Sequence, residues 1–164
     1  MRNLTATICL AVALLLGSAG VSWSQDYQKG LAAYKSGDYA TALREWKPLA
    51  KQRDADVQFN LSFMYDHGRG VPQDYMTAVK WYRLAAEQGD ADAQNNLGQM
   101  YDNGTGVLQD YVRVNMWFNT AAISGKSRNV SKNRDIIAKR MTPSQLEKAQ
   151  DLARECVRKN YKGY

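Results

Sequence analysis

The chain is poor in the residues that build metal sites, disulfide frameworks and flexible linkers. Its 164 residues include one histidine, two cysteines and three prolines. One histidine excludes a site built on several histidine ligands, two cysteines exclude a disulfide-dense scaffold, and three prolines exclude a proline-rich linker protein. Hydrophobic residues make up 45% and charged residues 23% of the sequence, as in an ordinary globular chain. We therefore expect a folded domain that holds no metal and no cofactor.

Residues 1–24 have the pattern of a secretory signal peptide. Arg2 precedes an apolar stretch of about a dozen residues, which is shorter than the roughly 20 residues of a membrane-spanning helix. Small side chains at Ser22 and Ser24 fit a cleavage site before Gln25. A retained membrane anchor is the alternative. We expect cleavage, so that the mature chain is periplasmic or secreted and has no integral membrane segment.

The formal net charge of +6 is concentrated near the C-terminus. Residues 25–125 hold 10 Lys and Arg against 12 Asp and Glu, a net charge of −2, whereas residues 126–164 hold 11 against 4, a net charge of +7. Such a basic segment can attract an acidic protein surface, anionic lipid or a polyanionic envelope polymer. The alternative is the well-solvated outer face of a terminal helix. Because the protein is predicted to be exported, we do not expect nucleic acid as its partner.

An internal repeat predicts the architecture. Residues 54–89 and 90–125 are each 36 long, align without a gap and share 19 identical positions. A period in the thirties is typical of a solenoid of helical pairs, in which each unit buries its apolar face against its neighbours. Chance does not supply such a match, so we interpret each segment as one helical pair.

The residues of one unit indicate where its two helices begin and end. Leu61 and Tyr65 lie four positions apart, on one face of a first helix. Gly68 is suited to end that helix, because glycine adopts the left-handed conformation without steric cost. Asp74 stands where its carboxylate can cap the second helix. The second unit repeats this order and is predicted to fold in the same way.

This pattern resembles the Sel1-like repeat, a relative of the tetratricopeptide repeat. The second unit carries the resemblance in Ala91, Ala93, Leu97, Gly98, Tyr101, Gly104, Gly106, Val107, Asp110, Trp117, Ala121, Ala122 and Gly125, and the first unit carries their counterparts. Ser62 and Val114 depart from the pattern. The resemblance implies an all-α fold, a right-handed α-solenoid of stacked antiparallel helix pairs.

The flanking segments complete the predicted solenoid. Residues 25–53 resemble a tetratricopeptide-like helical hairpin with its turn at Gly37. Residues 126–164 are interpreted as a basic C-terminal helical cap, which resembles the terminal segment of exported bacterial Sel1-like proteins. In this cap, Thr142 and Gln145 form a capping box at the start of a capping helix. Cys156 lies on the apolar stripe of that helix, as a buried small hydrophobe or, alternatively, as the partner in an intermolecular disulfide.

Residues with catalytic potential are few. Cys156 would need a base, and the single histidine, His67, is distant in sequence and is replaced by Asn103 in the second unit. No phosphate-binding glycine loop and no acylation motif occurs in the predicted mature sequence. We therefore predict that the protein is not an enzyme.

The first helices of a paired-helix solenoid line its concave face, so their non-core positions are the candidate binding residues. Spacings of four, three and four place two matching sets on that face: Asp56, Asn60, Phe63 and His67, and Asp92, Asn96, Gln99 and Asn103. The asparagines could bond a peptide backbone, and Phe63 offers an apolar anchor. The alternative is that the asparagines tie one repeat to the next and that the other side chains are solvated.

These observations favour a non-catalytic protein–protein interaction scaffold, adaptor or regulator of the bacterial cell envelope. It would bind a protein or peptide partner on the concave face. The resemblance implies the same, because Sel1-like proteins commonly scaffold complexes or modulate signalling partners, sometimes sensor kinases. The alternative function is an envelope-associated module in which residues 126–164 bind an anionic polymer or a membrane surface.

Overall fold

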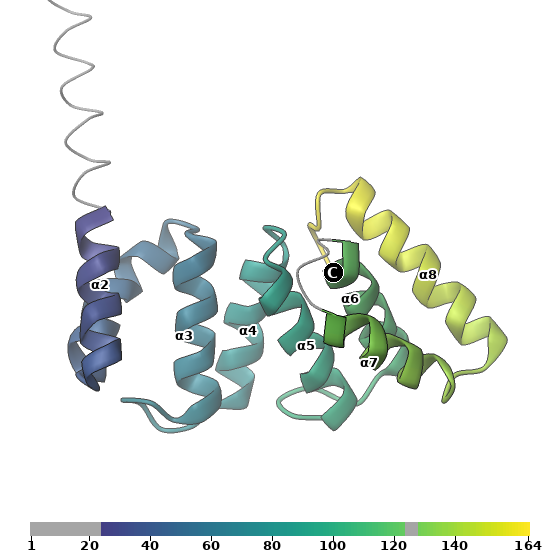
Figure 1. Ribbon diagram of the computed structural model, residues 1–164, viewed down its shortest axis with the longest axis horizontal. Helices are drawn as coiled ribbons and strands as arrows, with labels where there is room; N and C mark the ends of the chain where they lie inside the picture. Colours follow the sequence, from purple (N-terminus) through teal and green to yellow (C-terminus); the bar gives the residue numbers. More distant parts are fainter. Residues whose placement is uncertain (1–23, 124–127) are drawn as a thin grey trace, which may run out of the picture. The chain divides into compact units, whose positions relative to one another are not determined.

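The computed structural model describes residues 24–123 and 128–164, and these are helical apart from short connections (Figure 1). Residues 1–23, which hold nearly all of the predicted signal peptide, lie outside the described residues. Residues 24–36 form the first described helix. The following helices are α2 (Tyr39–Lys51), α3 (Ala55–His67), α4 (Tyr75–Ala86), α5 (Ala91–Asn103), α6 (Tyr111–Ile123), α7 (Arg128–Ala138) and α8 (Pro143–Arg158). No strand occurs in this part of the chain, which confirms the predicted all-α class.

The chain divides into two compact units, Met1–Leu49 and Ala50–Tyr164. The described part of the first unit is a helical hairpin that turns at Gly37 and buries Ala42, Leu43, Trp46 and Leu49. The indole Nε1 of Trp46 donates to the carbonyl oxygen of Tyr27 at 3.3 Å. A Cβ at Gly30 would collide with the Trp46 ring. The close approach of the two helices therefore depends on glycine at this position.

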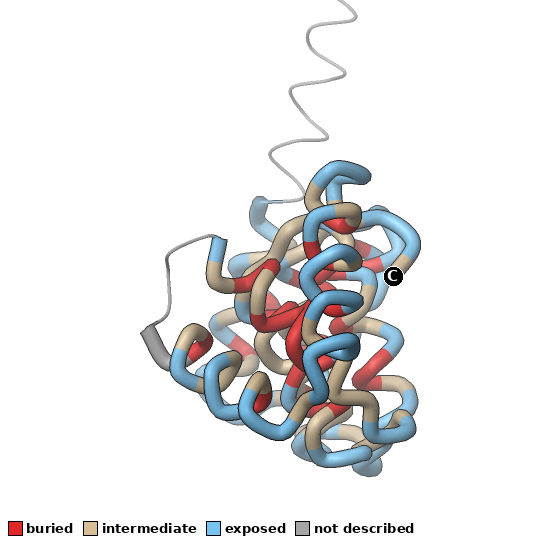
Figure 2. Tube along the Cα trace, turned by 90° about the vertical axis from the view of Figure 1, so that its right-hand side faces the viewer, coloured by how far each residue is buried: buried red, intermediate tan, exposed pale blue. Residues whose placement is uncertain are grey.

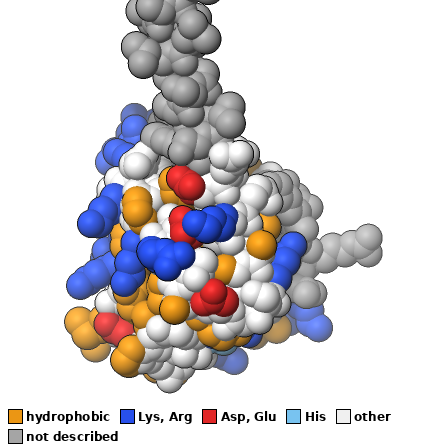
Figure 3. Space-filling view, turned by 90° about the vertical axis from the view of Figure 1, so that its left-hand side faces the viewer, with side chains coloured by type: hydrophobic (Ala, Val, Ile, Leu, Met, Phe, Trp, Pro, Cys, Tyr) orange, Lys and Arg blue, Asp and Glu red, His pale blue; other side chains and the backbone are white. Residues whose placement is uncertain are grey.

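The outer surface of this hairpin carries charges of both signs. The Oε1 atom of Glu45 forms ion pairs with Nζ of Lys29 at 2.9 Å and with Nη2 of Arg44 at 3.2 Å. The space-filling view of this end shows basic side chains spread among apolar, neutral and acidic ones (Figure 3). These ion pairs hold the pKa of Glu45 below its ordinary value. The hairpin therefore presents a mixed surface rather than a field of one sign.

In the second unit, the predicted helical pairs are present. Helix α3 packs on α4, α5 packs on α6, and α4 packs on α5. Asp54 and Asp90 cap the two first helices by accepting the backbone N–H of Val57 at 3.0 Å and that of Ala93 at 2.6 Å. The carboxylate of Asp74 accepts the N–H of Thr77 at the start of α4. The cap at Asp74 was predicted from the sequence.

Two glycines of the second repeat allow a close approach of neighbouring elements. Gly106 has a φ of 70°, and a Cβ there would lie 2.5 Å from the carbonyl oxygen of Tyr75 at the start of α4. Gly98 lies against Phe118, whose ring would be 2.7 Å from an added Cβ. The first contact joins the loop of the second repeat to the first repeat, and the second joins α5 to α6.

The C-terminal cap has two helices, one more than the single capping helix predicted, and both α7 and α8 pack on α6. Helix α6 is consequently buried on almost all sides, at Val114, Asn115, Met116, Trp117, Phe118, Thr120 and Ala121. The view from this end shows buried positions facing inward and exposed positions on the outside of α8 (Figure 2). By contrast, Trp81 of α4 is only half-buried.

The chain after α8 folds back onto the first repeat. Asn160 and Tyr161 have φ values of 50° and 65°, in the left-handed region. The backbone N–H of Tyr161 donates to the carbonyl oxygen of Cys156 at 2.7 Å. This turn places the Tyr161 ring 3.1 Å from the position of a Cβ on Gly89, in the connection between α4 and α5.

Candidate functional site

The eight predicted binding residues lie on the first helices α3 and α5, but at two different levels. Asp56 and Asp92 lie in the first turns, whereas His67 and Asn103 are the last helical residues. Asp56 and His67 are therefore separated by about 16 Å along the helix axis. A small ligand cannot contact both levels at once.

The N-terminal level is acidic. Burial raises the pKa of Asp90, and the nearby carboxylates of Asp92 and Asp56 raise it further, against the lowering effect of the Ala93 N–H. Within residues 24–123 and 128–164, no group of three or more His, Cys, Asp or Glu side chains is arranged to hold a metal ion. Asp56 and Asp92 lie in the first turns of α3 and α5. There each carboxylate interacts favourably with the positive end of the helix dipole.

The C-terminal level contains a hollow of about 380 Å³ between α3 and α5. Five of the predicted residues line it, namely Phe63, His67, Asn96, Gln99 and Asn103. Asp66, Tyr75, Met100 and Thr105 complete the lining, and sequence reasoning missed them. The spacing rule that predicted the site applies only to the first helices. It could not find Tyr75 and Thr105, which belong to the second helix and to the glycine loop.

Phe63 is part of an aromatic stack. The Phe63 and His67 rings are 3.9 Å apart between centroids, with an angle of 19° between their planes. The guanidinium carbon of Arg69 lies 5.0 Å from the Phe63 centroid. The side of the hollow formed by Phe63 is therefore a stack of two rings and a cation.

Asn96 has a structural partner. Its Nδ2 donates to the hydroxyl of Tyr82 at 3.1 Å, and that hydroxyl donates to Oδ2 of Asp66 at 3.4 Å. Tyr82 is fully buried, and burial, reinforced by the Asp66 carboxylate, raises its pKa well above the ordinary value. The hydroxyl therefore stays protonated and links α3, α4 and α5. This arrangement is the inter-repeat tie given above as the alternative role of the asparagine.

A second hollow, of about 300 Å³, lies between α5 and α7. Gln99 and Asn103 line it as well, together with Asp102, Phe118, Asn133, Ile136 and Ile137. We call the surface that contains both hollows the first-helix face. The residues of α7 were missed because residues 126–164 were interpreted only as a cap.

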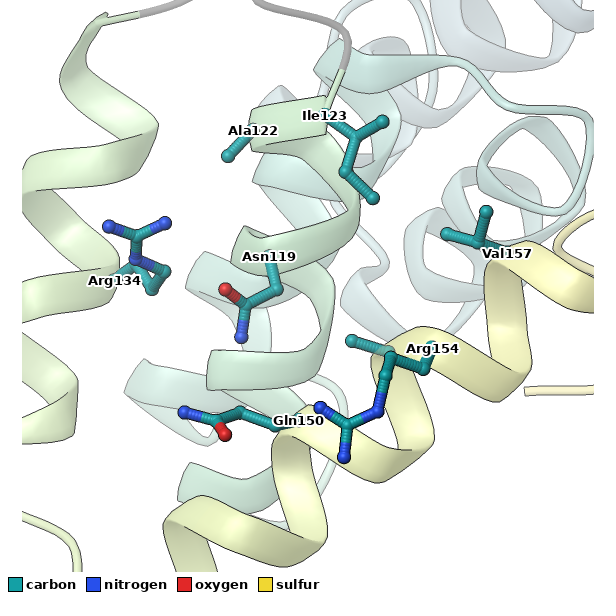
Figure 4. Close-up of a pocket in the computed structure, with 8 residues that line it drawn as sticks. Asn119, Ala122, Ile123, Arg134, Gln150, Arg154 and Val157 are labelled. Carbon is teal, nitrogen blue, oxygen red and sulfur yellow. The ribbon is translucent and has the colours of Figure 1, made fainter.

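A third hollow, of about 500 Å³, separates α7 from α8 above α6 (Figure 4). Its lining is apolar at Ala122, Ile123, Ala153 and Val157, with Asn119 and Gln150 among them and Arg134 and Arg154 on the flanking helices. Arg134 pairs with Asp135 at 2.7 Å, and Arg154 pairs with Asp151. We call this hollow the cap groove. Sequence reasoning missed it, because it depends on how far α7 and α8 diverge.

Cys156 is fully buried on α8 and forms no disulfide among the described residues. Burial, with a smaller effect from Glu87, raises the pKa of its thiol to about 11. A thiol with this pKa is protonated at neutral pH and is a poor nucleophile. The contacts of Cys156 fit its reading as a small buried hydrophobe.

The family model of the Sel1 repeat matches residues 55–90 and 91–126. The chain carries two Sel1 repeats. Their limits are shifted by one residue from the repeat units 54–89 and 90–125 predicted above. Sel1 repeat proteins generally mediate protein–protein interaction and are generally non-catalytic scaffolds.

Solved structures of other Sel1 repeat proteins share the fold. One is a protective antigen present in uropathogenic Escherichia coli strains and displaying an SLR fold, with 31% identity and a TM-score of 0.79 over 85% of this chain. This chain spans only 30% of the length of that antigen. Another is a Sel1 repeat protein from Oxalobacter formigenes, with 28% identity and a TM-score of 0.63, covering 76% of this chain and 96% of that one. These neighbours confirm an α-solenoid of repeats. No curated protein matches the sequence.

Proposed function

We propose that the protein is a non-catalytic adaptor or regulator of the bacterial cell envelope that binds a protein or peptide partner on its first-helix face. The observation that carries the proposal is the position of Gln99 and Asn103. Both side chains are exposed, and both line the hollow between α3 and α5 as well as the hollow between α5 and α7. They therefore join the two hollows into one surface that crosses three helices.

The chemistry of this surface suits a polypeptide. The side-chain amides of Gln99 and Asn103 can each donate and accept, which are the requirements for bonding a peptide backbone. Ile136, at the far hollow, is 41% exposed and offers apolar contact. An extended segment that crosses α5 could thus place its backbone on the amides and an apolar side chain against α7.

The envelope location rests on residues 1–24. Within the described helices none combines the length and the apolar character needed to cross a membrane. Mass spectrometry of the protein from its native host tests the export proposal. We expect a mature chain that begins at Gln25 and is recovered from the periplasm or the medium. An intact N-terminus in the cytoplasm would contradict export without bearing on the binding face.

Site-specific crosslinking tests the binding face. A photo-crosslinking amino acid at Gln99 is expected to capture a discrete partner in native cells, whereas the same amino acid at Met76, which is 63% exposed on α4, is not. The double change Gln99→Arg with Asn103→Arg adds bulk and charge at the centre of the face. It is expected to abolish recovery of the partner.

The matched control is Met76→Arg with Leu84→Arg, which adds the same charge at two exposed positions of α4. Thermal unfolding must show that both double variants are folded. Equal recovery of the partner with both would overturn the first-helix face as the binding site. Loss of recovery with the control alone would move the site to the second helices.

The alternative function, binding of an anionic surface through residues 126–164, is favoured by the charge count in this segment. Asp135, Asp151 and Glu155 are already paired with basic side chains of the same helices, and a net charge of +7 remains over residues 126–164. Sedimentation with anionic vesicles across a salt series tests this alternative. Electrostatic binding weakens steeply as salt rises, and absence of binding at low salt would eliminate it.

A further inference from the structure

A cluster of hydrogen-bond donors lies between the second helices α4 and α6, away from the residues that line the first-helix face. Nη2 of Arg83 on α4 and Nη1 of Arg113 on α6 both donate to the hydroxyl oxygen of Tyr101, each at 2.9 Å. Tyr101, on α5, is only 3% exposed. Two guanidinium groups therefore converge on a single neutral oxygen.

This cluster has more donors than acceptors. A phenol oxygen has two lone pairs, and both are engaged by the arginines, so the O–H of Tyr101 must point to a third group. None of the residues in the described chain accepts it. Nε of Arg83 is also buried, and no described group accepts a hydrogen bond from it. Buried donors are normally satisfied, so this arrangement lacks an acceptor.

The charge of the cluster fits an anion with one negative charge. Both guanidinium groups are permanently charged, and the only acidic residue lining the same hollow is Asp110, whose Oδ2 lies 3.6 Å from Nε of Arg113. Two positive charges and one negative charge leave a net charge of +1. A carboxylate neutralises this charge, whereas a phosphate dianion exceeds it.

The hollow also has an apolar rim. It measures about 450 Å³, and Val107 and Leu108 of the connecting loop form part of its lining. Leu108 is 90% exposed, more than any other large hydrophobic residue in the ranges 24–123 and 128–164. A ligand that brings an apolar group beside its carboxylate would cover Leu108 as well as satisfy the donors.

The corresponding positions of the first repeat differ. Thr77 stands at the position of Arg113 and Pro72 at that of Leu108, while Tyr65 keeps the tyrosine. The hydroxyl of Thr77 donates to its own cap, Asp74, at 2.6 Å. The arginine pair therefore joins the first repeat, through Arg83, to the second, through Arg113, and the first repeat folds without an arginine at the position of Arg113.

We propose that Arg83, Arg113 and the hydroxyl of Tyr101 bind a carboxylate carried next to an apolar side chain, as at the C-terminus of a peptide that ends in leucine. The site is separate from the first-helix face. It provides a second attachment point for a polypeptide chain, on the opposite helices of the same repeats.

Nuclear magnetic resonance tests the site directly through the Nε–H signals of the two arginines and the methyl signals of Leu108. The probes are N-acetyl-leucinate, acetate and inorganic phosphate, added to the full chain at constant ionic strength. We expect saturable shifts of all three residues with N-acetyl-leucinate, weaker binding of acetate because it lacks the apolar group, and weaker binding of phosphate.

Arg113→Thr, which installs the residue of the first repeat, is expected to weaken binding of N-acetyl-leucinate by about tenfold or more, because a charge-assisted hydrogen bond is lost. Lys80→Gln removes one positive charge from an exposed position of α4 and should leave the affinity unchanged. Absence of saturable shifts in the unmodified chain would overturn the proposal, and so would equal affinities of Arg113→Thr and Lys80→Gln. Tighter binding of phosphate than of N-acetyl-leucinate would overturn the assignment of the ligand.

Discussion

In the two Sel1 repeats the helices of each pair pack on one another, whereas α7 and α8 each pack on α6 and make little contact with one another. Helix α4 keeps an exposed side with Lys80 and Leu84, and the corresponding residues of α6, Met116 and Thr120, are buried. The first arrangement gives closed pairs. The second leaves the cap groove within the pair.

The connections account for much of this difference. In each repeat a glycine loop returns to the helix before it: the N–H of Asp74 donates to the carbonyl oxygen of Tyr65, and the N–H of Asp110 donates to that of Tyr101. Gln73 and Gln109 add side-chain bonds to the last turn of the same helices, each at 2.6 Å. The link between α7 and α8 is short and has no such glycine loop. The glycine loop, more than the helices themselves, therefore holds the two helices of a repeat against one another.

The largest expected effect comes from changing that loop. Gly106→Ala would place a Cβ against the backbone of Tyr75 at a positive φ, and we expect it to lower the free energy of unfolding by about 3 kcal/mol. Gly104→Ala has a similar φ of 67° but meets no atom closer than 3.7 Å, so its cost should be about 1 kcal/mol. Urea denaturation measures both. Equal losses would show that the contact between loop and α4 does not stabilise the array.

An intermediate effect is expected at the start of α8. The hydroxyl of Thr142 accepts the N–H of Gln145, and the Gln145 side chain accepts the N–H of Thr142. Thr142→Ala should lower the free energy of unfolding by about 1 kcal/mol. The control Ser144→Ala, at an exposed position two residues later, should change it little. If α8 detaches separately from the closed pairs, Thr142→Ala will also speed maleimide labelling of Cys156 in the folded protein. Unchanged labelling would show that the cap and the repeats unfold together.

The smallest effect distinguishes two N-caps. The folded state binds a proton at Asp90 more tightly than the unfolded state, because its pKa is raised, so stability falls as pH rises from about 4 through the raised value. Asp90→Asn keeps a capping oxygen and should remove this fall, with a change within about 0.5 kcal/mol at pH 7. Bonds from Thr77 lower the pKa of Asp74, so its contribution is lost as pH falls through the lowered value, and Asp74→Asn should remove that loss. Urea denaturation from pH 3 to 8 measures both, and identical pH profiles would contradict the assignment.

The sequence predicted what depends on local order. The helix caps Asp54, Asp74 and Asp90, the terminating glycines and the capping box at Thr142 follow from residue type and spacing, and all are present. The repeat period predicted the stacking of the pairs for the same reason. The site was predicted only in part. Five of the eight residues do line one hollow, but the stack of Phe63 on His67 depends on rotamers that spacing does not specify.

The features that were missed depend on contacts between distant segments. The cap groove requires the divergence of α7 and α8, and the convergence of Arg83 and Arg113 on Tyr101 requires three helices. One signal for the cap was present in the sequence. After Arg113, helix α6 contains no charged residue, which is typical of a helix that is covered on all sides. At the position of the exposed Lys80 of α4, α6 has the buried Met116.

The contact of Tyr161 with Gly89 has a consequence for how such an array can change its number of repeats. Tyr161 contacts the turn that precedes the last repeat, so the last repeat sets the position of this contact, whatever the number of repeats before it. A duplicated 36-residue segment inserted upstream would therefore leave the contact of Tyr161 intact. A tandem copy of residues 90–125 would place Gly125 at the position that Gly89 occupies, so the array can lengthen while the contact of the chain end is kept.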